Sequence, residues 1–203
     1  MTAPDGDGVE AAAAPGVEPG ARPDAEAGSG APATPVRPIL VLVGPPGSGK
    51  TSVGLIVARL TGRQFRDTDS DIESTAGRPI PDIFLTDGEP AFRALERAAV
   101  ATALAGHDGV LALGGGAILA EPTRDLLRKH TVVFLSVTMP TGVRRTGLAT
   151  NRPLLTGVNP RATYKALLDA RMPLYQEVAT LEVATDDLTI AQVATVIVEE
   201  LKL

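Results

Sequence analysis

The segment Gly44–Thr51 reads G-P-P-G-S-G-K-T and matches the phosphate-binding motif G-x-x-x-x-G-K-[ST]. It follows the apolar run Pro38–Val43 and precedes a helical pattern at Ser52–Thr61, which is the context that this motif requires. Glycines allow backbone N–H groups to surround a phosphate, and the N-terminus of the helix adds a partial positive charge. The segment therefore predicts a nucleotide site rather than a structural turn.

The individual residues of this loop have expected roles. Lys50 is expected to reach the β- and γ-phosphates of the nucleotide, and the hydroxyl of Thr51 is expected to ligate Mg²⁺. We expect the nucleotide to be contacted by Gly47, Ser48, Gly49, Lys50, Thr51 and Ser52.

A second group of reactive side chains lies at 67–71, where three carboxylates fall within five residues. A calcium loop is excluded because Ile72 and Arg78 stand where that loop needs Gly and Glu. A helix cap formed by Asp69 or Ser70 would explain part of the cluster. Since the cluster also lies at a strand-to-helix junction of a P-loop protein, one carboxylate could hold Mg²⁺ and another could receive a hydroxyl proton.

Three consecutive glycines, Gly114, Gly115 and Gly116, follow the buried-strand pattern Val110–Leu113. Such a run costs conformational entropy unless a turn or a ligand requires close approach to the backbone. We therefore expect this triplet to be functional.

These groups must be positioned by alternating strands and helices. Strand-like apolar runs occur at Pro38–Val43, Val110–Leu113, Thr131–Val137 and Leu181–Ala184. Helical patterns occur at Ser52–Thr61, Pro81–Leu85, Pro90–Leu104, Arg124–Lys129, Thr141–Thr150, Arg161–Val178 and Ile190–Leu201, and Asn151–Asn159 reads as a loop. The alternation predicts an α/β fold whose parallel sheet is covered by helices on both faces.

The composition excludes several classes of protein. The 203 residues have room for one ordinary domain, and the chain has no Cys, which excludes disulfides and thiolate chemistry. A net charge of −5 and 3% aromatic residues argue against a nucleic-acid surface. No stretch approaches 18 apolar residues, so we expect no membrane span and a cytoplasmic protein. The two histidines, His107 and His130, are expected at the surface.

The N-terminal segment differs from the rest of the chain. Its first 35 residues contain 10 Ala, 6 Gly and 6 Pro, and six acidic residues against Arg22 alone. So few large apolar side chains cannot offset the entropy of ordering. We predict that 1–36 is a disordered acidic tail and that 37–203 is the folded domain. The tail is either a solvated extension or a segment that binds a partner.

Seven motifs in order make this chain resemble the shikimate kinase family of small P-loop phosphotransferases. The motifs are G-P-P-G-S-G-K-T at 44–51, D-T-D-x-x-I-E at 67–73, I-x-D-I-F-x-x-D-G-E-x-x-F-R-x-L-E at 80–96, L-G-G-G-A at 113–117, V-R-R-T at 143–146, N-R-P-L-L at 151–155 and R-x-P-L-Y at 171–175. The resemblance implies a three-layer P-loop kinase fold, in which helices flank a five-stranded parallel sheet, with a substrate-binding helical segment and a lid loop.

The resemblance also implies an activity and a substrate site. The activity is ATP-dependent phosphorylation of the 3-hydroxyl of shikimate, in the pathway to chorismate and the aromatic amino acids. Asp69 would hold that hydroxyl as the candidate base, and Arg93 and Arg171 would bind the carboxylate of shikimate from two sides. The backbone of Gly114, Gly115 and Gly116 would contact the substrate, and an apolar wall would be formed by Phe84 and Phe92.

On the nucleotide side, the resemblance implies that Asp67 binds Mg²⁺ through water. Arg145 would lie against the adenine, and Arg152 would be the lid arginine that enters the site over the phosphates. Catalysis would then depend on Asp69, Lys50 and Arg152. We expect ATP and shikimate as the ligands, no nucleic-acid partner and a monomer.

Two alternatives remain open from the sequence. A gluconate kinase shares the P-loop and the size, but it should lack the paired Arg93 and Arg171. A non-catalytic module of the same fold should lack the acidic pair, Asp67 and Asp69, or the lid arginine. One departure from the family is visible after the last strand, where a basic residue often lies beside the adenine but this chain has Asp186 and Asp187.

Overall fold

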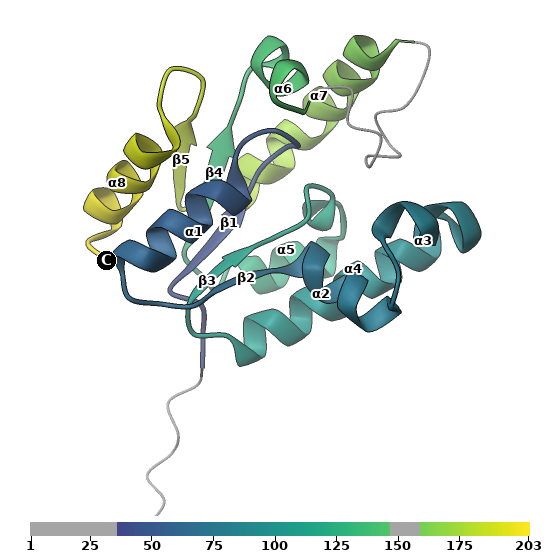
Figure 1. Ribbon diagram of the computed structural model, residues 1–203, viewed down its shortest axis with the longest axis horizontal. Helices are drawn as coiled ribbons and strands as arrows, with labels where there is room; N and C mark the ends of the chain where they lie inside the picture. The colour runs from purple at the N-terminus through teal and green to yellow at the C-terminus, as the bar shows by residue number, and fades with distance from the viewer. Residues whose placement is uncertain (1–35, 147–158) are drawn as a thin grey trace, which may run out of the picture. The chain divides into compact units, whose positions relative to one another are not determined.

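A computed structural model describes residues 36–146 and 159–203 of the chain (Figure 1). The strands that it contains are β1 (Leu40–Val43), β2 (Phe65–Asp67), β3 (Val110–Ala112), β4 (Val132–Ser136) and β5 (Leu181–Ala184). The helices are α1 (Lys50–Leu60), α2 (Thr68–Ala76), α3 (Ile80–Thr86), α4 (Gly88–Gly106), the 3₁₀ turn η1 (Ala117–Leu119), α5 (Glu121–Leu127), α6 (Met139–Thr146), α7 (Pro160–Val178) and α8 (Ile190–Leu201).

The strands form one parallel sheet in the order β2-β3-β1-β4-β5. In the centre, Val41 pairs with Leu111 of β3 on one side and Val132 of β4 on the other. All carboxyl ends therefore lie at one edge of the sheet, and a crevice opens where the chain order reverses beside β1. The predicted five-stranded parallel sheet with flanking helices is confirmed.

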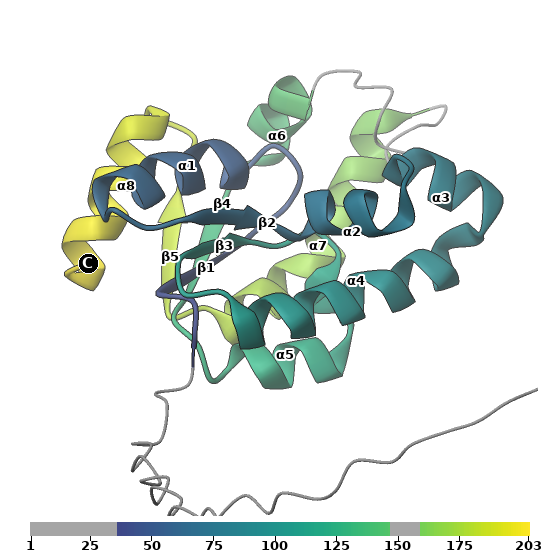
Figure 2. The same ribbon diagram turned by 60° about the horizontal axis from the view of Figure 1, so that its bottom comes forward.

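Alternation along the strands divides the core between the two faces of the sheet. In β1, Val41 and Val43 pack with residues of α4, α5 and α7, whereas Leu40 and Leu42 pack with residues of α1 and α8. Figure 2 shows α1 and α8 on one side of the sheet and α4 and α5 on the other. Because both faces are covered, the central strands β1 and β3 are continuously apolar and buried.

A smaller apolar cluster organises the helices that follow β2. Ile72 of α2, Ile83 of α3 and Phe92 of α4 are buried together. These helices extend beyond the carboxyl end of β2 and β3 (Figure 1). The cluster therefore holds α3 beside the edge of the sheet at which the P-loop lies.

Within the described ranges, no helix is both long enough and apolar enough to cross a membrane.

Three local predictions were wrong. Asp67, and not Asp69 or Ser70, caps α2: the chain leaves β2 in extended geometry, and Oδ1 of Asp67 accepts from the backbone N of Asp69 at 3.0 Å. Helix α5 begins at Glu121 rather than Arg124, because Pro122 suits the first turn of a helix. His107 is buried, and its Nε2 lies 3.2 Å from the carbonyl oxygen of Val110.

The segment expected to form the lid lies outside the described residues. Helix α6 begins at Met139, two residues before the prediction, and the expected helical residues 147–150 are not described. Of the expected loop Asn151–Asn159, residues 151–158 lie outside the described residues, and Arg152 is among them. The first residue of the second described range, Asn159, caps α7 by accepting from the backbone N of Ala162 at 3.1 Å.

The packing of α1 against the sheet can be tested at Gly54. A methyl group there would lie 2.4 Å from the ring of Phe65 and 3.0 Å from the side chain of Leu42. We expect Gly54→Ala to cost about 1–3 kcal/mol, which lowers the melting temperature by roughly 2–10 °C. Gly106→Ala is the matched control, since that helical glycine has no heavy atom within 4 Å of the added methyl. Thermal unfolding measures both, and equal melting temperatures for the two variants would contradict the packing described.

Candidate active site

The P-loop connects β1 to α1 at the carboxyl edge of the sheet. Gly47 and Gly49 have φ values of 81° and 93°, which glycine adopts without the strain that a side chain would impose. Helix α1 begins at Lys50, so Lys50 and Thr51 occupy its first turn. The backbone N–H groups of a first turn have no partner within the helix and are available to an anion.

A cavity of about 610 Å³ lies on one side of this loop and is here called the P-loop cavity. It is lined by Gly47, Ser48, Gly49, Lys50, Thr51, Ser52, Val53, Arg145, Thr185, Leu188, Thr189, Ile190 and Val193. The structure thus places all six predicted P-loop contacts and Arg145 around one space. Arg145 is held there by donating from Nη1 to Oγ1 of Thr185 at 2.8 Å and from Nη2 to the carbonyl oxygen of Thr185 at 2.6 Å.

Lys50 folds back over its own loop. Its Nζ donates to the carbonyl oxygens of Gly44 at 2.8 Å and Pro45 at 3.2 Å. These contacts keep the ammonium group at the mouth of the loop, where a bound phosphate would lie.

The two residues expected at the metal site are in direct contact. Oγ1 of Thr51 donates to Oδ2 of Asp67 at 2.9 Å, while Oδ1 of Asp67 caps α2. A hydroxyl and a carboxylate oxygen are thereby fixed side by side between the ends of β1 and β2. This donor set suits Mg²⁺, which is usually held by one or two protein oxygens together with substrate phosphates.

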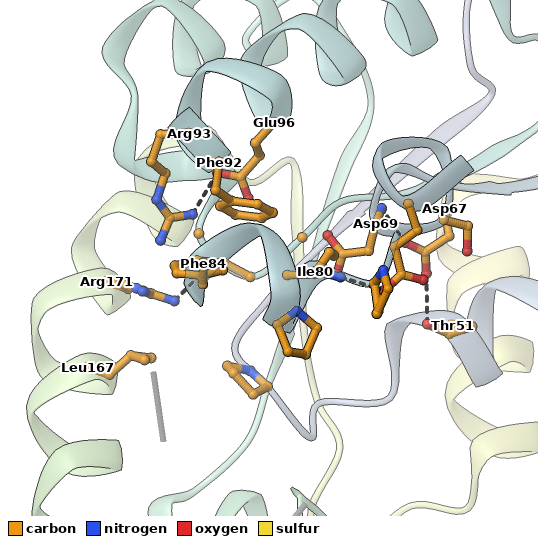
Figure 3. Close-up of a pocket in the computed structure, with 18 residues that line it drawn as sticks. Thr51, Asp67, Asp69, Ile80, Phe84, Phe92, Arg93, Glu96, Leu167 and Arg171 are labelled. Carbon is orange, nitrogen blue, oxygen red and sulfur yellow. Dashed lines mark hydrogen bonds and ion pairs between the residues drawn. The ribbon is translucent and has the colours of Figure 1, made fainter. Parts of the chain in front are cut away.

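A second cavity, of about 530 Å³, lies between the carboxyl edge of the sheet and the helices α2, α3, α4 and α7. It is here called the arginine cavity, and it is lined among others by Pro46, Thr51, Asp67, Asp69, Phe84, Phe92, Arg93, Glu96, Gly114, Gly115, Gly116 and Arg171. Figure 3 shows Arg93 and Arg171 toward one end of the cavity and Asp67 and Thr51 toward the other.

Arg93 is fixed by carboxylates of its own helix. Its Nη1 donates to Oε2 of Glu96 at 2.6 Å, and its Nη2 donates to Oε1 of Glu89 at 2.9 Å. Its guanidinium carbon lies 5.3 Å from the ring centroid of Phe92, whose centroid is 4.5 Å from that of Phe84. The expected apolar wall therefore also supports the arginine.

Arg171 approaches from α7 on the opposite side. Its Nη1 donates to the carbonyl oxygen of Gly115 at 3.1 Å, and the same oxygen accepts from the hydroxyl of Tyr175 at 2.5 Å. Arg171 is only 8% exposed, yet in the parts of the chain described here no carboxylate forms an ion pair with it. Its charge is thus buried mainly against neutral acceptors, an arrangement that favours an anionic ligand.

Burial shifts the pKa values of the charged side chains at the arginine end of this cavity. Burial raises the pKa of the Glu96 carboxyl, and the opposing effect of Arg93 reduces the rise. For Arg93, burial alone would lower the pKa, but Glu96 and Glu89 outweigh it and the pKa is raised. For Arg171, burial lowers the pKa and the charge of Arg93 adds to the effect. Arginines remain protonated in proteins, so the cavity holds two positive charges beside one buried acid.

The glycine triplet lets these groups approach the end of β3. A methyl on Gly116 would lie 2.1 Å from Nη1 of Arg93, and one on Gly114 would lie 2.5 Å from Oδ1 of Asp69. Any side chain there would displace the arginine or the carboxylate. The backbone N of Gly114 also donates to Oγ1 of Thr68, a fully buried residue, at 3.2 Å.

Most of the predicted site residues come together around the two cavities, and Arg152 lies outside the described residues. The sequence reasoning missed three side chains that hold the site. Tyr175 belongs to the R-x-P-L-Y motif, which could have indicated it, and Thr68 lies between the two expected aspartates. Tyr164, which donates to the carbonyl oxygen of Pro46 at 2.7 Å, has no motif around it.

Comparison with known proteins agrees with this geometry. The family model described as shikimate kinase matches residues 46–202. A shikimate kinase of Saccharopolyspora erythraea is 64% identical over 74% of this chain and 86% of its own length, and one of Salinispora arenicola is 62% identical over 78% and 95%.

Among solved structures, a shikimate kinase from Acinetobacter baumannii in complex with shikimate matches with a TM-score of 0.79 at 38% identity. The match covers 82% of this chain and 93% of that one. The chain therefore belongs to the shikimate kinase family.

Proposed function

We propose that this chain transfers the γ-phosphoryl group of ATP to the 3-hydroxyl of shikimate, giving shikimate 3-phosphate and ADP on the route to chorismate and the aromatic amino acids. One observation carries the proposal: the buried Arg171, the half-buried Arg93 and Asp69 line one cavity that reaches the P-loop through Pro46 and Thr51. Shikimate has one carboxylate and several ring hydroxyls, so such a cavity can fix one end of it and present the other to the nucleotide.

The arginines supply the binding end of the cavity. A guanidinium group can hold a carboxylate through two parallel hydrogen bonds, and the contact is stronger when both groups are shielded from water. Arg93 is oriented by Glu96 and Glu89, and Arg171 by Gly115 and Tyr175, so both are positioned before the substrate arrives. Positioning in advance reduces the entropy lost on binding.

The acidic and basic groups near the P-loop supply the chemistry. The oxygen of the 3-hydroxyl would attack the γ-phosphorus in line with the departing ADP, and Asp69 would accept the proton that this hydroxyl loses. Lys50 would neutralise charge on the phosphates, and Arg152 would add a second positive charge from the lid. Because the transfer is direct, no protein nucleophile is needed.

Thr51 and Asp67 would hold Mg²⁺, Thr51 directly and Asp67 through water. Their contact at 2.9 Å supports this assignment, because it brings two oxygen ligands together at the end of the P-loop. When bound, the ion would neutralise charge on the phosphates during transfer. On the nucleotide side, we assign Gly47 to Ser52 to the phosphates and Arg145 to the adenine, since all of them line the P-loop cavity.

The remaining assignments rest on the sequence. We propose a monomeric, cytoplasmic enzyme whose partners are ATP and shikimate, without a nucleic-acid partner, in line with a net charge of −5. The division into a disordered tail at 1–36 and a kinase domain at 37–203 is proposed on composition.

The activity is tested by measuring ADP release with shikimate, quinate and gluconate as acceptors. We expect ATP- and Mg²⁺-dependent turnover with shikimate and only background hydrolysis with gluconate. Equal or faster turnover with gluconate would overturn the proposed substrate, and ADP release that no acceptor stimulates would overturn the assignment as a small-molecule kinase.

The role of Asp69 is tested by Asp69→Asn. If Asp69 accepts the hydroxyl proton, turnover should fall by roughly 10²–10⁴-fold, whereas nucleotide affinity stays nearly unchanged. Asp71→Asn is a matched control on the same helix, since Asp71 pairs with Arg66 and does not line the arginine cavity. Steady-state kinetics with calorimetric binding of ATP measure both effects. Turnover of Asp69→Asn within threefold of the wild-type value would rule out the base.

Binding and chemistry can be separated at the arginines. Arg93→Ala and Arg171→Ala should weaken shikimate binding by roughly 10- to 100-fold, because each removes a charge-assisted contact made in both the ground and transition states. Arg152→Ala should act mainly on turnover, since its contact forms over the phosphates. Arg128→Ala, which removes two ion pairs outside both cavities, with Asp125 and Glu177, serves as the control. Direct titration with shikimate and steady-state kinetics distinguish the classes, and the reverse pattern would show that the two roles are misplaced.

A further inference from the structure

Helix α6 is held at both ends by the residues that follow β5. At its N-terminal end, the backbone N of Thr138 donates to Oδ1 and Oδ2 of Asp186 at 3.2 and 3.1 Å, and Oγ1 of Thr138 lies 2.5 Å from Oδ1. At the other end, Arg145 donates to the side chain and the carbonyl oxygen of Thr185. Thr185 and Asp186, which are neighbours in the connection between β5 and α8, thus fix the position of α6 beyond the carboxyl end of β4 (Figure 1).

The segment that holds α6 is itself attached to the sheet. The backbone N and Oγ1 of Thr185 both donate to the carbonyl oxygen of Ser136 at 3.0 Å, and Thr185 is 2% exposed. Ser136 is the last residue of β4. Thr185 therefore has little freedom, and Arg145 is bound to a rigid acceptor rather than to a mobile loop.

The position of α6 also determines one wall of the P-loop cavity. A methyl on Gly47 would lie 2.9 Å from the carbonyl oxygen of Gly142, which shows that α6 is packed directly on the phosphate loop. Gly142 also packs closely against the ring of Tyr164, whose hydroxyl donates to Pro46. A displacement of α6 would therefore move Arg145 and, at the same time, Gly142, which packs on Gly47.

The carboxylate of Asp186 suits this position. A negative charge at a helix N-terminus is stabilised by the unpaired backbone N–H groups and by the helix dipole. Burial alone would raise the pKa of Asp186, but hydrogen bonds from Thr138 and Thr141 outweigh it, and the pKa lies below its ordinary value. Asp186 is not among the residues that line the P-loop cavity.

We propose that Asp186 is a positioning residue for nucleotide binding, which caps α6 from across the fold and so keeps Arg145 at the wall of the P-loop cavity. The inference rests on the proposed function only in that this cavity takes the nucleotide. This role explains why an acidic residue lies near a site for a polyanionic ligand. The carboxylate of Asp186 contacts the start of α6 and does not line the P-loop cavity.

The test compares Asp186→Ala with Asp187→Ala in the full-length chain. Asp187 is the adjacent exposed residue, and it forms no ion pair within the described residues. Calorimetric titration with ADP in the absence of shikimate should give an affinity for Asp186→Ala roughly 5- to 30-fold weaker than wild type, the size expected for a lost helix cap. Asp187→Ala should bind ADP as the wild type does. Asp186→Asn, which keeps one acceptor oxygen, should recover part of the affinity.

The same variants are titrated with shikimate alone, whose affinity should stay within twofold of wild type. Equal loss for both ligands would show general destabilisation and would overturn the positioning role, as would unchanged ADP affinity in Asp186→Ala. If that variant does not fold, Thr138→Ala removes the hydroxyl partner and should give a smaller loss confined to ADP; no loss there counts against the proposal. Absence of phosphoryl transfer to shikimate by the wild type would refute the proposed function but would leave this comparison of ADP affinities valid.

Discussion

Two guanidinium groups inside one cavity, with a single buried carboxylate between them, set the strongest constraint on this molecule. Glu96 is 3% exposed and pairs with Arg93 at 2.6 Å, while Arg171 is held by Gly115 and Tyr175. Burying a charge is costly unless it is paired. Arg93 is paired with Glu96 and Glu89, whereas Arg171 forms no ion pair among the described residues. A ligand carboxylate would complete the pairing, and the surrounding elements hold the two arginines in place until it arrives.

The fold supplies that arrangement through its sheet. Parallel pairing brings the ends of β1, β2 and β3 to one edge, so that the P-loop, Asp67 and the glycine triplet adjoin although they are far apart in sequence. The triplet then allows Arg93 and Asp69 to lie against the backbone. On the other side of β1, Thr185 and Asp186 hold α6 over the phosphate loop. Each cavity thus has one wall from the P-loop and another fixed by contacts between distant segments.

Much of this could be predicted from sequence, because local patterns carry it. The bounds of β5 and α8 were predicted to the residue, and the start of α1 was predicted to within two residues, since it begins at Lys50 rather than Ser52. The cap of α2 was missed because Asp67, Asp69 and Ser70 could each cap the helix, and only the path of the chain out of β2 decides between them. The start of α5 was missed although Pro122 is a local signal for the first turn of a helix. The contacts of Thr68 and Tyr175 span 46 and 60 residues, and no local pattern encodes such pairings.

The central claim, that the arginine cavity recognises a carboxylate, is tested most directly by comparing shikimate with its uncharged carboxamide. Calorimetric titration of the wild type should show the amide bound roughly 10- to 100-fold more weakly, because it cannot pair with two guanidinium groups. In Arg171→Ala the difference between the two ligands should shrink markedly. If the wild type binds the amide as tightly as the acid, the buried charges do not recognise a carboxylate and the account is wrong.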